Sequence, residues 1–302
     1  MTGGPPDGIA ARIRAQGAVL DMRATQEIYA PLLAAQPRDG VEVRRDLAYG
    51  PDARHRLDVY RAEPARQATP PRAMPVLIVF HGGGFVRGDK LERENAGLFF
   101  AREGFLALVP NYRLGPAHTW PAAAEDVVSA LKWAVAQAPA YGADPGRIWL
   151  LGESAVAAHV ATAALLRRFH PAGGLPIAGA VLVSGVYNVQ LERLARRQFG
   201  IATPDPRNEA YFGVDFARYP GMSVVEQIDS ASFPLLITYA ELDMPQMQVQ
   251  AGELFARLVT HHGFEPELRV IPGHNHLTQV YSVNTGDHSL TAPVLEFLRG
   301  GA

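Results

Sequence analysis

The chain has 302 residues, of which 48% are hydrophobic, so it is long enough to bury one large core and carry additions to it. Its formal net charge is −2 and it contains no basic run, which argues against nucleic acid as a partner. No apolar stretch reaches membrane-spanning length and the first residues lack a signal-peptide pattern, so we expect no membrane partner and a cytoplasmic location.

The first part of the chain has helical character. Apolar residues within residues 9–36 recur at roughly helical spacing, which predicts one or two amphipathic helices in an N-terminal segment of residues 1–40. The Pro- and Ala-rich stretch at 62–75 separates two strand patterns, and we interpret it as a surface loop.

A glycine-rich loop follows the first clear buried strand. Residues 76–80 are apolar and mostly β-branched or aromatic, which predicts a strand that ends at His81 and leads into three glycines. Glycine lets the backbone adopt unusual φ values and lets a substrate approach the N–H groups, which can stabilise a developing oxyanion. We therefore expect Gly83 and Gly84 to donate to an oxyanion. A phosphate-binding loop is the alternative, but neither of its glycine motifs is present in the right context.

A serine occupies a strand–turn–helix pattern. Residues 147–151 predict a second buried strand, residues 155–166 predict a helix, and Ser154 lies at the turn between them. Such a turn can present a nucleophilic hydroxyl, and the N–H of Ala155 at the helix start would add a third oxyanion donor. An ordinary helix-capping serine is the alternative.

The turn departs from the usual G-x-S-x-G pattern at one position. Val156 replaces the second glycine, and a β-branched residue there could strain the turn or displace the serine.

A serine nucleophile needs a base and an acid that orients the base. Where a serine is presented at such a strand–turn–helix turn, these can follow it in the order acid, then histidine, each just past a strand. The apolar run at 233–240 ends before Glu241 and Asp243, and an alternating run ends before His274 and His276. Both carboxylates and both histidines are therefore candidates at this point.

A zinc site built from Asp243, His274 and His276 is a further alternative. The chain has no H-E-x-x-H motif and no cysteine, and zinc would leave the serine motif unexplained. We expect no metal and no cofactor.

The chain resembles the hormone-sensitive-lipase-like branch of the α/β hydrolases, a group of carboxylesterases related to arylformamidases. The similarity runs from about residue 41 to the end of the chain. It rests on five motifs: His81-Gly82-Gly83-Gly84-Phe85, Asn111-Tyr112-Arg113-Leu114, Asp144-Pro145-Gly146-Arg147, Gly152-Glu153-Ser154-Ala155 and Gly273-x-x-His276.

This resemblance implies roles for particular residues. The family pattern puts the acid directly before the following helix, which favours Asp243 over Glu241, and the G-x-x-H spacing selects His276 over His274. Ser154 is then the nucleophile, Asp243 the orienting acid and His276 the general base. The implied oxyanion hole consists of Gly83, Gly84 and Ala155.

The other histidines are expected to do no chemistry. His81 orders its own loop, His159 packs within the helix after the serine, and His261 and His262 mark a solvated helix end.

The resemblance also implies an organisation: an α/β-hydrolase fold with a mostly parallel sheet flanked by helices in residues 41–302. Residues 1–40 either form part of a lid or pack behind the sheet. A cap-like insertion is expected at 187–230. Its large apolar side chains either wall the substrate pocket or form the core of the cap itself: Tyr187, Leu191, Phe199, Tyr211, Phe212, Phe216 and Tyr219.

We therefore expect a serine carboxylesterase that hydrolyses short- to medium-chain or aryl esters through an acyl-enzyme. Its expected partner is a small-molecule ester, and the sequence does not decide whether the protein forms a homodimer. Its rate should rise with pH through an ordinary histidine pKa of about 6–7. An arylformamidase with the same triad and a non-catalytic ligand-binding protein of this fold are the alternatives. Val156 is the only hint toward the binding protein.

Overall fold

Eight strands form one sheet in the computed structural model of this chain, which describes residues 3–63, 73–198 and 206–300. Their order is β1-β2-β4-β3-β5-β6-β7-β8, with β2 antiparallel to β1 and β4 and every later pairing parallel. The strands are β1 (Val41–Ala48), β2 (Arg56–Ala62), β3 (Met74–Phe80), β4 (Leu106–Pro110), β5 (Ala143–Glu153), β6 (Gly179–Val183), β7 (Leu235–Leu242) and β8 (Glu267–Asn275).

The parallel register brings the carboxyl ends of the later strands to one edge of the sheet. Phe80 of β3 pairs with Gly152 of β5, and Glu153 of β5 pairs with Val183 of β6. At the far side Leu242 of β7 pairs with Asn275 of β8. In parallel α/β sheets this edge is where ligands bind, because the connecting loops converge there.

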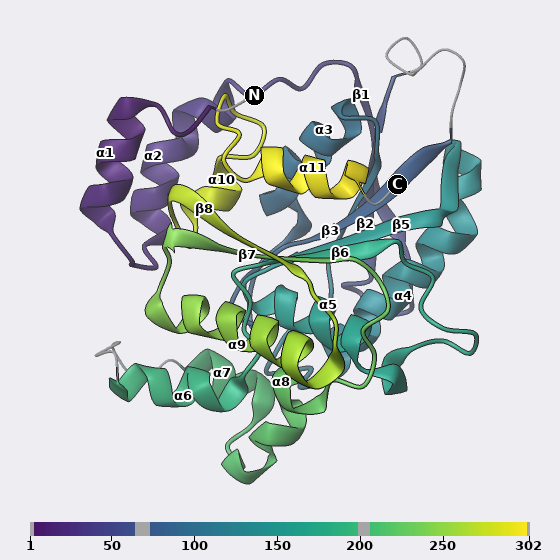
Figure 1. The fold of residues 1–302 in the computed structure, drawn as a ribbon. Helices are drawn as coiled ribbons and strands as arrows, with labels where there is room; N and C mark the ends of the chain where they lie inside the picture. Colours follow the sequence, from purple (N-terminus) through teal and green to yellow (C-terminus); the bar gives the residue numbers. More distant parts are fainter. Residues whose placement is uncertain (1–2, 64–72, 199–205, 301–302) are drawn as a thin grey trace.

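Helices cover both faces of the sheet, as the family resemblance implied (Figure 1). One core joins α4, α5 and α9 to the face that carries Val76 and Ile78, and a second joins α3 and α11 to the face that carries Leu77 and Val79. The longer helices are α1 (Asp7–Gln16), α2 (Met22–Ala34), α3 (Glu94–Arg102), α4 (Ala122–Gln137), α5 (Ala155–Leu165), α6 (Val189–Gln198), α7 (Pro206–Phe212), α9 (Pro245–His262) and α11 (Thr291–Gly300). Short helical turns are η2 (Lys90–Arg93), η3 (Ala138–Tyr141), η4 (Arg167–Phe169), η5 (Phe216–Met222), α8 (Val224–Gln227) and α10 (Thr278–Tyr281).

Two helices form at the N-terminal end, within the span that the apolar spacing indicated. The Asp21 carboxylate accepts from the Ala24 N–H and caps α2. Figure 1 shows α1 and α2 beside β8 and α10, and the Asn275 side chain fixes their connection by donating to Gln16 Oε1 (3.0 Å) and to the Gly17 carbonyl (3.2 Å). The pair therefore packs at the end of β8, next to the edge where the strands converge.

The segment between β6 and β7 is helical, and it buries most of its own aromatic residues. Tyr187, Tyr211, Phe212 and Tyr219 are all buried, and the Tyr211 ring stacks on Phe85 at 5.3 Å between centroids. These aromatics belong to the core that joins α4, α5 and α9 to the sheet, so of the two readings that the sequence left open they follow the one in which they pack in a core. Phe199, together with the middle of the expected surface loop at 64–72, lies outside the described residues.

Two element boundaries differ from the sequence expectation. β5 begins at Ala143 and so includes the Asp144-Pro145-Gly146-Arg147 motif that was expected to precede the strand, because β3 and β5 already pair at Met74 and Ala143 before a shift in register. β7 extends to Leu242, past Glu241. None of the described helices is both long and apolar enough to cross a lipid bilayer.

Candidate active site

Ser154 lies at a sharp turn between β5 and α5. Its backbone has φ +54°, in the left-handed region that a non-glycine residue adopts at a cost of about 1–2 kcal/mol. The Ser154 N–H donates to the Val183 carbonyl at 2.8 Å, which ties the turn to β6. Ser154 occupies the N-cap position of α5, yet its side chain makes no capping hydrogen bond. Its Oγ lies 2.8 Å from Nε2 of His276 instead.

His276 connects the serine to a carboxylate. Its Nδ1 lies 2.8 Å from Asp243 Oδ1, so Ser154, His276 and Asp243 form one hydrogen-bonded line. Asp243 and His276 are 1% and 5% exposed, so their contact is buried, whereas the Ser154 end of the line opens on the cavity. Burial opposes protonation of His276, but the charge and hydrogen bond of Asp243 outweigh it and raise the histidine pKa above its usual value.

The two competing residues make other contacts. Glu241 is exposed, and its carboxylate accepts the Gly273 N–H at 2.7 Å. His274 lies with Nε2 3.0 Å from Asp287 and Nδ1 3.1 Å from Thr278. The two histidines therefore face different carboxylates. Asp243, His274 and His276 do not come together as a zinc site, and the described residues contain no other group of three potential ligands.

The glycine loop after β3 faces the same cavity as Ser154. Gly83 and Gly84 both have positive φ, +142° and +59°. A Cβ atom on Gly83 would lie 1.9 Å from the Arg87 carbonyl oxygen, so no larger residue fits there. Ala155 is the first residue of α5, and the first N–H groups of a helix have no acceptor within it. The three expected oxyanion donors thus lie around one cavity.

A buried ion pair that the sequence did not indicate fixes this loop. Glu153 Oε1 accepts the Gly82 N–H at 2.7 Å and pairs with the guanidinium of Arg93, whose Nε lies 2.7 Å away. Both side chains are buried. The position of Glu153 at the end of an apolar strand could have indicated that its carboxylate is buried. Arg93 lies in a distant turn, and no sequence pattern indicated its contact with Glu153.

Two buried histidines near the loop are not placed for proton transfer. His81 Nδ1 lies 2.7 Å from the Gly82 carbonyl, and burial lowers its pKa to about 4. His159 packs against Phe85 and Tyr211, and burial lowers its pKa to about 3. Both rings are neutral near pH 7 and pack inside the protein.

Val156 does not displace the serine. The close approach of strand and helix occurs at Gly152, where a Cβ atom would lie 2.9 Å from Val160 and 3.0 Å from Ala157. Val156 itself is fully buried in the core beneath α5. Ser154 Oγ remains 2.8 Å from His276 Nε2, so the displacement of the serine that Val156 could have caused is not observed.

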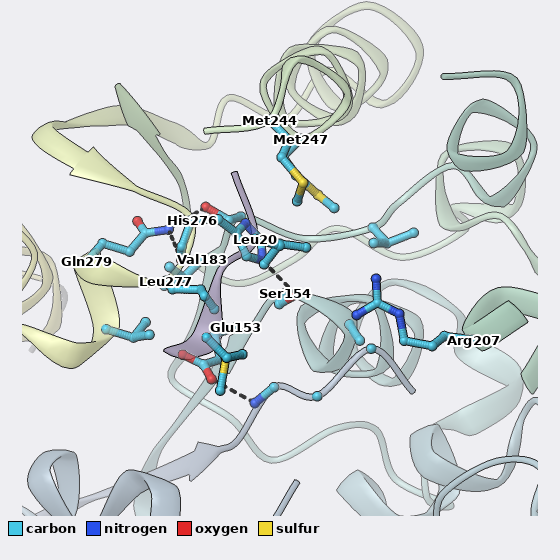
Figure 2. A pocket seen from close by; sticks show the side chains of 18 of the residues that line it. Leu20, Glu153, Ser154, Val183, Arg207, Met244, Met247, His276, Leu277 and Gln279 are labelled. Carbon is cyan, nitrogen blue, oxygen red and sulfur yellow. Dashed lines mark hydrogen bonds between the residues drawn. The ribbon is translucent and has the colours of Figure 1, made fainter. Parts of the chain in front are cut away.

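The cavity in front of Ser154 has a volume of about 630 Å³ and is shown in Figure 2. The N-terminal segment contributes Leu20 to it, Met247 of α9 and the preceding N-cap residue Met244 line it, and Arg207 enters from the opposite side. None of the seven large apolar residues expected to wall the pocket from 187–230 lines it within the described part of the chain. That segment contributes Glu192, Arg207 and Asn208 instead. The cavity wall combines aliphatic and methionine side chains with charged ones, which are Arg87, Glu92, Arg93, Glu153, Glu192 and Arg207.

Comparison with known sequences gives matches across much of the chain. A family profile described as alpha/beta hydrolase fold matches residues 77–280. The chain is 37% identical to esterase LipC of Mycobacterium tuberculosis over 113 residues, which span 37% of this chain but only 27% of that protein. It is 26% identical to ethyl acetate hydrolase of Pseudomonas putida over 283 residues, 87% of this chain and 86% of that protein.

Solved structures share the whole fold. A bacterial heroin esterase superimposes with a TM-score of 0.74 at 25% identity, covering 98% of this chain and 97% of that one. A hyperthermophilic esterase from the archaeon Pyrobaculum calidifontis superimposes with a TM-score of 0.69 at 22% identity and covers 99% and 98% of the two chains. The second similarity concerns the fold alone.

Replacing Glu153 separates its two contacts. Glu153→Gln keeps an oxygen for the Gly82 N–H but leaves Arg93 buried without a counter-charge, so the free energy of unfolding should fall by about 3–5 kcal/mol. Glu153→Leu also removes the acceptor for the loop, and we expect a further loss of about tenfold in kcat for ester hydrolysis. Denaturant titration and steady-state kinetics measure the two effects. Equal kcat values for the two folded variants would contradict a role of Glu153 in holding the loop.

Val156→Gly tests the departure from the usual turn sequence. The change removes a buried side chain and places glycine in a helix, so the free energy of unfolding should fall by about 2–4 kcal/mol. The kcat of ester hydrolysis should stay within about twofold, because the serine is already in place. A large gain in kcat would show that Val156 does impair the turn.

Proposed function

We propose that this chain, which belongs to the α/β hydrolase fold family that it matches over residues 77–280, is a serine carboxylesterase. Membership of that family agrees with the hormone-sensitive-lipase-like motifs in its sequence. The observation that carries the proposal is the hydrogen-bonded line from Ser154 through His276 to Asp243, open to a cavity with a glycine loop on its rim. These are the parts that acyl transfer through a covalent intermediate requires.

The first half of the proposed reaction acylates the serine. Ser154 Oγ attacks the ester carbonyl carbon while its proton passes to His276 Nε2, 2.8 Å away. Asp243 holds the ring through Nδ1 and stabilises the imidazolium that forms. The N–H groups of Gly83, Gly84 and Ala155 stabilise the negative oxygen of the tetrahedral intermediate. The carbon–oxygen bond to the alcohol then breaks, and the leaving oxygen takes the proton from Nε2.

The second half releases the acid. Water enters the position that the alcohol has left, gives its proton to His276 Nε2 and attacks the acyl carbon. The second tetrahedral intermediate uses the same donors and expels Ser154 Oγ, which recovers the proton. The carboxylic acid leaves and the starting arrangement returns, so the cycle needs no cofactor.

The cavity supports small or medium esters as substrates. Its volume of about 630 Å³ falls within the usual range of small-molecule sites, roughly 300–1,000 Å³. Aliphatic and methionine side chains suit an acyl chain or an aromatic alcohol. The names of two similar proteins, an ethyl acetate hydrolase and a heroin esterase, refer to acetate esters of very different alcohols. We propose short- to medium-chain or aryl esters as the substrate class.

Two segments frame the cavity in this proposal. Ala18, Val19, Leu20 and Met22, between and at the start of the N-terminal helices, line it, which favours a lid role for residues 1–40 over packing behind the sheet. The insertion at 187–230 acts as a cap that contributes polar rather than aromatic side chains to the wall.

Ser154→Ala should abolish formation of the acyl-enzyme. We expect release of p-nitrophenol from p-nitrophenyl butyrate to fall by at least about 10⁴-fold, because the nucleophile is removed while the fold is retained. The parent protein is measured beside it, together with an N-formyl aromatic amine as a second substrate. Turnover of the amide alone would favour an arylformamidase, and undiminished ester turnover in the variant would exclude Ser154. If the folded parent turned over neither substrate, the ligand-binding alternative would be favoured.

The pH dependence follows from the state of His276. Only the neutral ring can accept the serine proton, so kcat/KM should rise with pH as the ring loses its proton. Since the pKa of His276 is raised, the half-maximal point should lie above the 6.5 of an ordinary histidine rather than at about 6–7. Asp243→Asn removes the negative charge that raises the pKa of His276, so the half-maximal point should move to lower pH. A rate that does not change from about pH 5 to 9 would count against His276 as the base.

A further inference from the structure

The carboxylate of Asp243 has hydrogen-bond donors on both of its oxygens. Oδ1 receives the His276 ring at 2.8 Å and the Met244 N–H at 2.9 Å. Oδ2 receives the Ser184 hydroxyl at 2.5 Å and, at 3.3 Å, the Ala240 N–H. The hydroxyl is thus the closest donor to the oxygen that faces away from His276.

Ser184 occupies an unusual backbone conformation directly after β6. Its φ is +49°, in the left-handed region, where a serine costs about 1–2 kcal/mol more than a glycine. It is 1% exposed, and its N–H donates to the Thr238 carbonyl of β7 at 2.8 Å. Strained residues of this kind persist where the surrounding structure holds them, and they cluster at functional sites. In this strained backbone conformation the Ser184 hydroxyl lies against Asp243.

Gln279 of α10 completes a closed ring of contacts. Its Nε2 donates to Ser184 Oγ at 2.7 Å and to the His276 carbonyl at 3.2 Å. The hydroxyl of Ser184 therefore accepts from Gln279 and can give its single proton only to Asp243. Gln279 lies beside His276 in Figure 2. The ring runs from Asp243 to Ser184, to Gln279, to the backbone of His276, and through its imidazole back to Asp243.

We propose that Ser184 and Gln279 are positioning residues for the esterase reaction, which fix the rotation of the Asp243 carboxylate and thereby the orientation of the His276 ring. The inference rests on the proposed function of the site. Without the Ser184 hydroxyl, Oδ2 would keep only the longer 3.3 Å contact with the Ala240 N–H. The carboxylate could then rotate more freely about its Cβ–Cγ bond and carry the imidazole with it. Since misplacement of a reacting group by about 1 Å can cost 100-fold in rate, this control matters for the transfer of the proton from Ser154.

The end of β6 also serves the nucleophile. The carbonyl of Val183 accepts the Ser154 N–H at 2.8 Å, and the next residue, Ser184, holds Asp243. One strand end thus fixes the serine and the acid with respect to each other, independently of the histidine between them.

Ser184→Gly removes the hydroxyl but also relieves the backbone strain, which offsets much of the cost of the lost hydrogen bond, so the variant should keep the fold. We expect kcat for p-nitrophenyl butyrate to fall about tenfold or more with KM changed less than about twofold, because acylation is slowed but the cavity is kept. Gln279→Leu should give a smaller loss in the same direction. Ser282→Ala is the matched control: it removes an equally buried hydroxyl, one that donates to the Gln279 carbonyl at 2.8 Å and does not contact Asp243. Its kcat should stay within about twofold of the parent.

A double-mutant cycle tests whether Ser184 acts through Asp243. In an Asp243→Ala background Ser184→Gly should cost less than about twofold, because the group it positions is gone. A full tenfold loss in that background, or an unchanged kcat in Ser184→Gly alone, would overturn the proposal.

A spectroscopic readout separates this proposal from the esterase assignment. The proton between His276 Nδ1 and Asp243 should give a downfield resonance that His276→Ala removes. In Ser184→Gly this resonance should shift or broaden, and in Ser282→Ala it should not. An unperturbed resonance in Ser184→Gly would overturn the positioning role even if the esterase proposal held. A perturbed resonance in a protein without ester turnover would uphold the positioning while the esterase proposal failed.

Discussion

The parallel register of the central strands is the constraint on which the candidate site depends. The ends of β3, β5, β6, β7 and β8 lie along one edge of the sheet, and each leads into one part of the site. The glycine loop follows β3, Ser154 follows β5, Ser184 follows β6, Asp243 follows β7 and His276 follows β8. A change of register by one residue would reverse the side to which each strand's side chains point and would separate these groups.

Buried charge accounts for the order around this edge. Asp243 and Glu153 are carboxylates in the interior, and both are held by several donors from different elements. A buried charge without partners is costly, so loss of any of these donors would destabilise the fold. Each carboxylate therefore fixes the position of the groups that donate to it. Glu153 holds the glycine loop in this way, and Asp243 holds the histidine. Glu153 contacts the loop that carries two of the proposed oxyanion donors, and Asp243 contacts His276, the proposed base.

Sequence patterns predicted the architecture well where the signal was local. Apolar runs indicated β3, β5 and β7, and an alternating run indicated β8. Helical spacing indicated the two N-terminal helices, and helix-forming residues indicated α5. The family resemblance separated Asp243 from Glu241 and His276 from His274, which the spacing of polar residues after strands had left open. For the insertion after β6 the sequence left open whether the aromatic residues wall the pocket or pack in a core. Tyr211 and Phe212 pack on each other and on Phe85, because burial of large apolar side chains stabilises the fold.

The sequence by itself determined several of the strands, the N-terminal helices, the turn at Ser154, and the glycines that the unusual φ values of the loop after β3 require. These are properties of short segments, and short segments carry them in composition and spacing. Only the tertiary structure decided which distant side chains meet. Arg93 pairs with Glu153, Ser184 donates to Asp243, and Gln279 joins that hydroxyl to His276. The contacts of these residues join elements far apart in the chain, so they depend on how the sheet and helices pack and have no signature in any single stretch of sequence.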